Sequence, residues 1–157
     1  MPTGCASARE VRARRGKCMN EKRPKDDPLE HTPPIAKLLG RTVIASDPCG
    51  TVELRFSARD EFTNRHGTIQ GGILTAMLDS AGGMASLAAL ERTSSIVTVE
   101  MKTTFFRPAR PGSLRALGRV IHRGKTLMHT EADLLDDDGA LIARATATFR
   151  IVRTRQP

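Results

Sequence analysis

One long apolar segment constrains the fold of this 157-residue chain more than any other feature. Residues 71–90 read GGILTAMLDSAGGMASLAAL and hold a single charged side chain, Asp79, among small and aliphatic residues. A helix that is apolar on most of its faces must be buried on most of its faces. The segment therefore predicts one central helix that the rest of the domain covers.

The remaining elements predicted from the sequence are mostly strands. Apolar and polar residues alternate, with turn residues between the runs, over 41–46, 51–58, 96–106, 113–122, 126–135 and 140–152. The sequence DDDG before the last run predicts a hairpin turn. A short helix over 34–40 is expected to begin at Pro34 and to end at Gly40. Because strands and helices do not alternate, we predict an α+β fold in which an antiparallel sheet wraps around one long central helix.

The net charge of +8 is concentrated near the amino terminus. Residues 1–25 hold eight basic and two acidic side chains, so this segment carries +6 and the rest of the chain only +2. We expect residues 1–33 to form a disordered basic tail and linker, and residues 34–157 to form the folded domain. A basic arm that touches nucleic acid or a membrane is the alternative. The lack of Trp and Tyr argues against a surface that stacks on bases, so no nucleic-acid partner is predicted.

Several other functional classes are disfavoured by the sequence. No stretch of about 18 apolar residues is free of charge, so no membrane span is expected. The amino-terminal stretch lacks the apolar core of a secretory signal. Three scattered cysteines (Cys5, Cys18 and Cys49) fit neither a disulfide framework nor a metal site. We therefore predict a cytoplasmic protein that needs no metal or organic cofactor.

The central helix begins with two glycines and carries one carboxylate. The free N–H groups at Gly71 and Gly72 would form an anion site that an oxygen can approach closely. The alternative is that these glycines only permit a tight loop or close packing. Asp79 has no cation among its helical neighbours. The alternative for Asp79 is simple exposure on a polar stripe with Thr75 and Ser86.

Gly71 and Asp79 are too far apart along one helix to act on the same atom. Eight residues at the helical rise separate them by about 12 Å along the axis. If both groups act on one ligand, they must come from two antiparallel helices that lie side by side. A two-fold homodimer supplies that arrangement and creates two equivalent sites, each built from both chains.

Three stretches of the chain, spread over roughly residues 34–152, resemble one enzyme family. They read NRHGTIQGGILTAMLDSAGG, VTVEMKTTFFRPARPG and GRVIHRGKTLMHTEADLLDDDGALIARATATF. They look like the hotdog-fold acyl-CoA thioesterases of the phenylacetate-pathway (PaaI-like) type. In that family an Asn is followed six positions later by the His of a His-Gly-Gly, and nine positions after that by an acidic residue. Asn64, Gln70 and Asp79 keep those spacings, whereas His66 lies thirteen residues before Asp79, in the wrong register.

The resemblance implies hydrolysis of an aryl or medium-chain acyl-CoA to a carboxylate and CoA. Asp79 would be the general base or the nucleophile. The N–H of Gly71 from the other protomer would hold the thioester oxygen as it becomes an oxyanion. Asn64 would orient the water or Asp79, and Thr98 would position the water. Gln70 departs from the family's His, because its amide donates a hydrogen bond but does not titrate near neutral pH.

The residues that would bind the rest of the substrate are less specific. The phosphates of CoA need cations at a surface groove, and the candidates are Arg107, Arg110, Arg123 and Lys125, with Gly72 at the helix start. Apolar side chains would line the acyl pocket or serve as ordinary core, and they include Met77, Met84 and Phe105. His122 and His129 are placed on strand faces and are given no chemical role.

Two other functions and the oligomeric state stay open from the sequence. Hydration of an enoyl thioester is a related hotdog reaction, but it usually requires an acid/base His where this chain has Gln70. A non-catalytic acyl-CoA sensor would leave Asp79 without a function. We expect a homodimer or a dimer of dimers.

Overall fold

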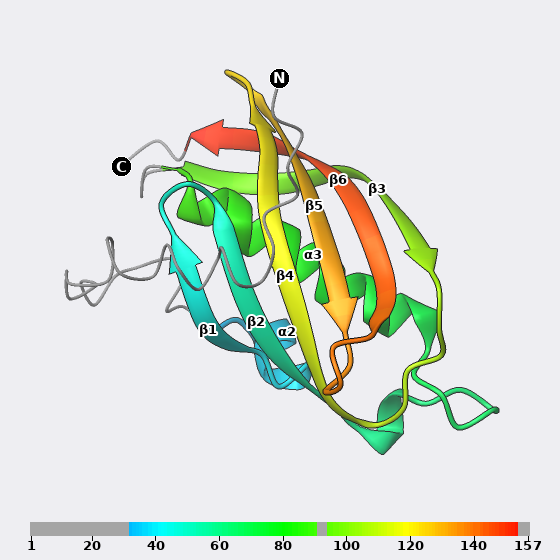
Figure 1. Ribbon diagram of the computed structural model, residues 1–157. Helices are drawn as coiled ribbons and strands as arrows, with labels where there is room; N and C mark the ends of the chain where they lie inside the picture. The colour runs from blue at the N-terminus through cyan, green and yellow to red at the C-terminus, as the bar shows by residue number, and fades with distance from the viewer. Residues whose placement is uncertain (1–31, 91–93, 154–157) are drawn as a thin grey trace.

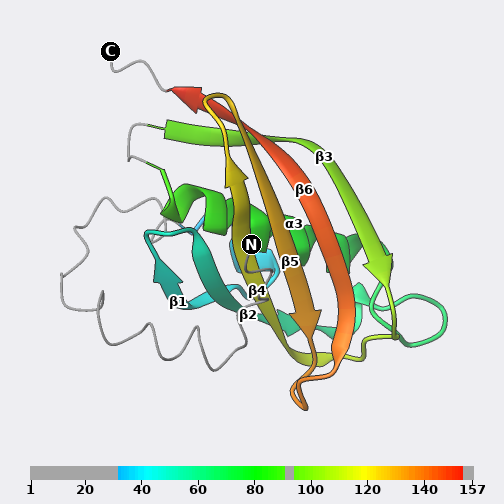
Figure 2. The same ribbon diagram turned by 45° about the horizontal axis from the view of Figure 1, so that its top comes forward.

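The computed structural model describes residues 32–90 and 94–153. A long helix, α3 (Gly71–Ala88), lies across one face of a curved six-stranded antiparallel sheet (Figures 1 and 2). The strands are β1 (Thr42–Asp47), β2 (Thr51–Ala58), β3 (Ser94–Phe105), β4 (Gly112–Arg123), β5 (Leu127–Leu135) and β6 (Leu141–Arg153). A short helix, α2 (Pro34–Leu38), and a 3₁₀ turn, η1 (Asp60–Phe62), complete the domain. The expected α+β architecture, a sheet around one long helix, is confirmed.

Local sequence signals place most elements within a few residues of their observed bounds. The DDDG turn forms as predicted: the Asp136 carboxylate accepts a hydrogen bond from the Ala140 N–H at 2.7 Å, and Gly139 has φ of +83°. The segment between β2 and α3, where the sequence analysis places no strand or helix, contains η1 and a β-bridge between Thr63 and Ile69. Residues 1–31 of the predicted tail and linker lie outside the described residues. Within the described ranges, no helix is long and apolar enough to cross a membrane.

The strand order is β1-β2-β4-β5-β6-β3, so β3 pairs with β6 and lies at an edge of the sheet. Although β3 and β4 are consecutive in sequence, they do not pair with each other. The RPARPG segment between them instead carries the chain from the edge to the centre of the sheet (Figure 1). Within the described residues, the other edge of the twelve-residue strand β3 has no partner strand. This edge runs beside α3.

Small residues allow α3 to pack very close to the sheet. A Cβ added to Gly118 in β4 would lie 2.3 Å from the carbonyl oxygen of Ala81, which belongs to the backbone of α3. A Cβ added to Gly82 would lie 2.8 Å from the Thr130 hydroxyl in β5. Around these contacts, α3 buries Leu74, Met77, Leu78, Met84 and Ala85 in the core. The helix backbone therefore rests almost directly on β4 and β5.

Replacing Gly118 by Ala is expected to destabilise the domain by about 1–3 kcal/mol or more, because the new methyl group meets backbone that cannot rotate away. Chemical denaturation of both proteins measures the loss. Gly72→Ala is the matched control, since a Cβ there meets nothing within 4 Å and Ala favours the helix by about 0.5–1 kcal/mol. Equal stability of Gly118→Ala and the wild type would show that the helix is not held this close to the sheet.

Candidate active site

One flank of α3 lies along β3 and carries the residues singled out in the sequence. Four residues on this flank, spaced four positions apart along α3, each lie next to a residue of β3. The pairs are Gly71 with Phe105, Thr75 with Thr103, Asp79 with Thr98, and Gly83 with Ile96. Positions four apart share one face of a helix. The two candidate groups of the helix, Gly71 and Asp79, therefore lie on the same flank and face the edge strand.

The Asp79 carboxylate is half-buried and hydrogen-bonded to Thr98. The Thr98 hydroxyl donates to Asp79 Oδ1 at 2.9 Å. A bulge between Thr98 and Glu100 interrupts the pairing of β3 with β6, and Val99 is the extra residue. Bulges bend a strand and re-aim its side chains, and they occur frequently next to active sites. In the described part of the chain, no cation forms an ion pair with Asp79, so this carboxylate is held by a neutral donor.

The alternative for Asp79, an exposed polar stripe with Thr75 and Ser86, does not form. Ser86 is buried, and its hydroxyl donates to the Gly82 carbonyl within α3 at 3.0 Å. Thr75 instead shares the flank of Asp79, and its hydroxyl lies 3.4 Å from that of Thr103. Asp79 therefore lies on the flank that faces β3 and does not belong to a solvated stripe with Ser86.

The start of α3 presents free backbone donors. Gln70 is the N-cap residue, and its side chain is exposed and makes no capping hydrogen bond. The Gln70 carbonyl accepts from the Ile73 N–H at 2.9 Å. Within the described residues, the N–H groups of Gly71 and Gly72 donate to no acceptor. The first N–H groups of a helix carry partial positive charge and suit an anionic oxygen.

Asn64 stabilises the loop that leads into α3. Its Oδ1 accepts from the N–H of His66 at 2.8 Å, and its Nδ2 donates to the Thr68 hydroxyl at 3.0 Å. His66 is exposed at the tip of this loop, and its Nε2 accepts from Arg65 Nε at 3.2 Å. Within one chain the structure brings neither Asn64 nor His66 into contact with Asp79. The side chain of Asn64 is used to fix the loop.

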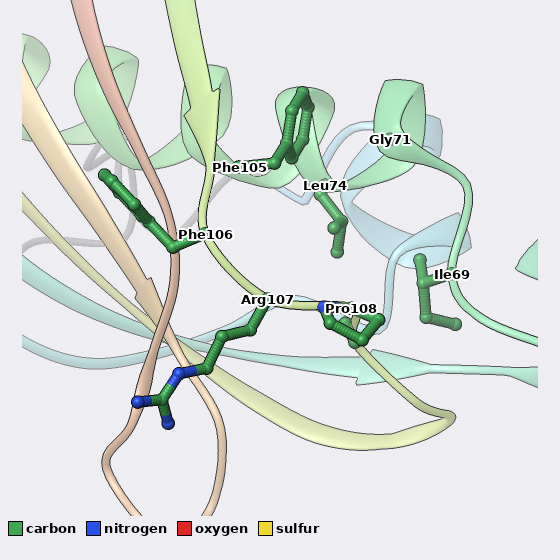
Figure 3. A pocket seen from close by; sticks show the side chains of 8 residues that line it. Ile69, Gly71, Leu74, Phe105, Phe106, Arg107 and Pro108 are labelled. Atoms are coloured by element: carbon green, nitrogen blue, oxygen red, sulfur yellow. The ribbon is translucent and has the colours of Figure 1, made fainter.

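A pocket of about 320 Å³ opens beside the start of α3 (Figure 3). Most of its lining is apolar and comes from three segments, namely the start of α3, the end of β3 and the turn that follows, with Ile69, Gly71, Leu74, Phe105, Phe106, Arg107, Pro108 and Ala109. The Phe105 ring lies against the helix, and a Cβ added to Gly71 would be 3.3 Å from Phe105 Cζ. In Figure 3 the guanidinium of Arg107 points away from α3. The pocket thus adjoins the free N–H groups.

Of the three apolar residues suggested for the pocket, only Phe105 lines it. Met77 and Met84 are buried in the core, so the core alternative holds for both. The other lining residues were not predicted from the sequence, although the two consecutive phenylalanines before the RPARPG turn could have indicated some of them. Arg41, which was not singled out from the sequence, anchors the start of β1 to α3: its guanidinium donates to the Ser80 hydroxyl at 2.9 Å, and burial lowers its pKa.

The four candidate cations lie in two separate pairs. Arg107 lines the pocket at the start of α3, and Arg110 is exposed in the same turn. Arg123 lies at the other end of α3, where its Nη1 donates to the Ala89 carbonyl at 2.5 Å, and Lys125 follows in the exposed β4–β5 turn. A cation near the last carbonyls of a helix is favourable. Within one chain, only Arg107 and Arg110 lie near the pocket.

No group of three or more His, Cys, Asp or Glu side chains that could hold a metal ion exists in the part of the chain described by the structure. The candidate site consists of a carboxylate with its hydroxyl partner, a helix start with free N–H groups, and an apolar pocket. A carboxylate can activate water or attack a carbonyl, and backbone N–H groups can stabilise an oxyanion.

Comparisons with known proteins agree with this chemistry. Residues 66–143 match the family model of the thioesterase superfamily. The human acyl-coenzyme A thioesterase 13 is 33% identical over 114 residues, which cover 71% of this chain and 81% of the human protein. A phenylacetic acid degradation-related protein of Ralstonia eutropha has a crystal structure that superposes with a TM-score of 0.73 at 38% identity, covering 76% of this chain and 91% of that chain.

The fold alone is also shared with a more distant protein. The PaaI protein from the phenylacetic acid degradation operon of E. coli superposes with a TM-score of 0.69 at 24% identity, covering 76% of this chain and 86% of that chain. The family match and the human relative carry the assignment of the family, and the superpositions carry that of the fold. The chain therefore belongs to the thioesterase superfamily, is a thioester hydrolase, and has the hotdog fold.

Proposed function

We propose that this protein hydrolyses the thioester bond of an aryl or medium-chain acyl-CoA to give a carboxylate and CoA. One observation carries the proposal: Asp79, hydrogen-bonded to Thr98 at 2.9 Å, lies on the same helix flank as the free N–H groups of Gly71 and Gly72. The human relative is an acyl-coenzyme A thioesterase by name, which supports a CoA thioester as substrate. Membership of the thioesterase superfamily favours hydrolysis over enoyl hydration or non-catalytic binding.

In the proposed reaction Asp79 acts as general base on water or attacks the thioester carbonyl directly. The carbonyl oxygen gains negative charge as the new bond forms, and the Gly71 N–H donates to it. When Asp79 acts as general base, the intermediate expels the CoA thiolate, which takes up the proton that Asp79 removed from water, and the acyl group leaves as a carboxylate. When Asp79 attacks directly, expulsion of the thiolate leaves a mixed anhydride with Asp79, and water then hydrolyses this anhydride to the free carboxylate and regenerates Asp79. The Thr98 hydroxyl holds Oδ1 of Asp79, and we assign the reaction with water or the thioester to the other carboxylate oxygen.

Two chains are needed because Gly71 and Asp79 are separated by about 12 Å along α3. In a two-fold dimer with antiparallel α3 helices, Gly71 of one protomer lies opposite the partner's Asp79 when the axis passes close to the midpoint, Thr75. Gly71, Thr75 and Asp79 stay partly exposed in the single chain, next to the edge of β3 that has no partner strand within the described residues, which supports such a contact. Each of the two sites would then draw its carboxylate from one chain and its oxyanion donor from the other.

Exposed apolar residues on β3, and Phe106 directly after it, support this dimer. In the single chain, 57% of Val97 and 58% of Val99 are exposed, as are 48% of Phe105 and 54% of Phe106. A long edge strand that exposes apolar side chains is prone to pair with another strand. Pairing of β3 with its symmetry mate would cover this edge and would place the two α3 helices side by side.

We assign the acyl group to the pocket beside Gly71, because its lining is apolar and includes the rings of Phe105 and Phe106. Arg107 and Arg110 are proposed to contact the phosphates of CoA. The other two cations, Arg123 and Lys125, lie at the carboxyl-terminal end of α3. In a dimer with antiparallel α3 helices, this end of the partner's helix points toward the pocket, so that the same two cations of the partner would approach the bound CoA. Gln70 and Gly72 are proposed to contact the thioester, and Asn64 to hold the loop from which they extend.

Asp79→Asn is expected to lower kcat/KM by about 10²–10⁴-fold, because an amide neither accepts the proton of water nor forms a mixed anhydride with the acyl group. Thiol release from a panel of acyl-CoA substrates measures the rate. Asp137→Asn, an exposed carboxylate in the β5–β6 turn, is the matched control and should retain the wild-type rate. Hydrolysis by Asp79→Asn at the wild-type rate would contradict the mechanism.

Thr98→Val removes the hydrogen bond to Asp79 with little change in shape. We expect kcat to fall by about tenfold or more while KM changes little, because a hydrogen bond to a charged group contributes about 1.5–3 kcal/mol. Thr98→Ser keeps the hydroxyl and should restore most of the rate. If the Val and Ser variants have the same kcat, Thr98 does not position the carboxylate.

Gly71→Pro tests the oxyanion donor, because Pro lacks the N–H yet is tolerated at the first position of a helix. We expect kcat to fall by about 10²–10³-fold. Gly71→Ala keeps the N–H and is the control for crowding against Phe105. A Gly71→Pro variant no slower than Gly71→Ala would exclude this N–H as the donor.

Subunit mixing tests whether each site is shared between chains. A heterodimer of one Asp79→Asn chain and one Gly71→Pro chain, isolated with two affinity tags, has one intact site and one doubly defective site if the sites are shared. It should recover about half of the wild-type rate per dimer. If each site lies within one chain, both sites are defective and the heterodimer is as slow as its parents. A fully active monomer in size-exclusion chromatography would also exclude the shared site.

A further inference from the structure

A row of polar side chains crosses four adjacent strands on the face of the sheet that points away from α3. The row consists of residues directly opposite one another in the pairing of β4, β5, β6 and β3, which lie side by side in Figure 1, and it reads His122, His129, Thr148 and Glu100. Met128 and Thr130 are buried under the sheet, so His129 between them faces outward. The proposed hydrolysis uses none of these four residues.

A bulge brings the two histidines together. Val120 pairs with Thr130, but the register then shifts, so that His122 rather than Ile121 lies opposite His129. In a regular ladder His122 would lie opposite Met128 and would point toward the core face, because a slip of one residue reverses the side of a strand. The bulge instead places two imidazole rings on the outer face, with their centroids 6.1 Å apart and their planes inclined by 31°.

The hydrogen bonds along the row fix which nitrogen of His129 is free. Glu100 Oε1 accepts from the Thr148 hydroxyl at 3.1 Å. Because an ionised carboxylate only accepts, Thr148 uses its single proton in this bond. His129 Nδ1, which lies 3.2 Å from the same hydroxyl oxygen, must therefore donate. The lone pair of neutral His129 is consequently on Nε2, the nitrogen that is left available for a ligand.

This arrangement has the features of a metal-ligand pair with its supporting residues. Histidines that bind metals usually donate their other N–H to an acceptor, which fixes the tautomer and the orientation of the ring. A Zn–N bond is about 2.0–2.1 Å long, so two imidazoles that share a tetrahedral ion have ring centroids roughly 5–6 Å apart. The observed centroid separation of 6.1 Å lies just above this range, so an ion shared by the two rings would draw them slightly closer. Both histidines are exposed, so an ion has direct access.

We propose that His122 and His129 form a two-histidine site for a divalent transition-metal ion such as Zn²⁺ on the outer face of the sheet. Two imidazoles supply the protein ligands, and water completes the coordination. Glu100 contributes negative charge at the end of the hydrogen-bonded row, and Thr148 acts as a positioning residue for His129. The site is separate from the flank of α3 that carries Asp79, so bound metal takes no part in hydrolysis.

Isothermal titration calorimetry of the full chain with ZnCl₂ and NiCl₂ at pH 7.5, where free imidazoles are mostly neutral, tests the site. We expect binding of a single ion per chain that is weakened at least tenfold in both His122→Gln and His129→Gln. His66→Gln, which removes an exposed histidine in the loop before α3, is the matched control and should bind as the wild type does. Wild-type binding by His122→Gln, or no binding by the wild type, would overturn the proposal.

The role of Thr148 is tested separately. Thr148→Val removes the acceptor for His129 Nδ1 and should weaken metal binding by about 10–100-fold. Thr148→Ser restores the hydroxyl and should restore the affinity, and circular dichroism checks that both variants are folded. Rates of acyl-CoA hydrolysis should be the same in all of these variants. If Thr148→Val binds zinc as tightly as Thr148→Ser, the hydrogen-bonded row does not orient the ligand and this part of the proposal fails.

Discussion

The close packing of α3 on the sheet is the contact on which the rest of the structure depends. Ala81 and Gly118 bring the helix backbone and β4 so near that no side chain fits between them. Gly82 does the same against Thr130 of β5. Such contacts fix both the distance and the rotation of the helix, because turning it would drive larger side chains into the sheet. With the rotation fixed, the flank that contains Gly71 and Asp79 faces the edge strand β3.

The position of β3 at the sheet edge then determines where the candidate groups lie on the molecule. The chain leaves α3, forms β3 beside β6, and returns to the centre of the sheet as β4. One side of β3 therefore stays open next to the helix flank, and the bulge at Val99 accompanies the contact of Thr98 with Asp79. A carboxylate, free helix N–H groups and an apolar pocket are thereby gathered along one accessible border of the molecule.

Much of the fold could be predicted because its signals are local. The apolar run at 71–90 and the alternating strands follow from periodicity, and the DDDG turn follows from backbone chemistry. The pairing of β3 with β6 could not be predicted in this way, because strand order depends on contacts between residues far apart in sequence. The same holds for the bulges that turn Thr98 toward Asp79 and His122 toward His129.

The sequence by itself determined the fold class and the chemical groups available to the candidate site. The spacing of Gly71 and Asp79 along one helix is a property of the chain, since the helical rise sets it. Only the tertiary structure decided how these groups are arranged: it joined Asp79 to Thr98, engaged Asn64 in its own loop, and divided the four cations between the two ends of α3. The physical reason is that side-chain partners are selected by packing and strand register, which a linear pattern does not encode.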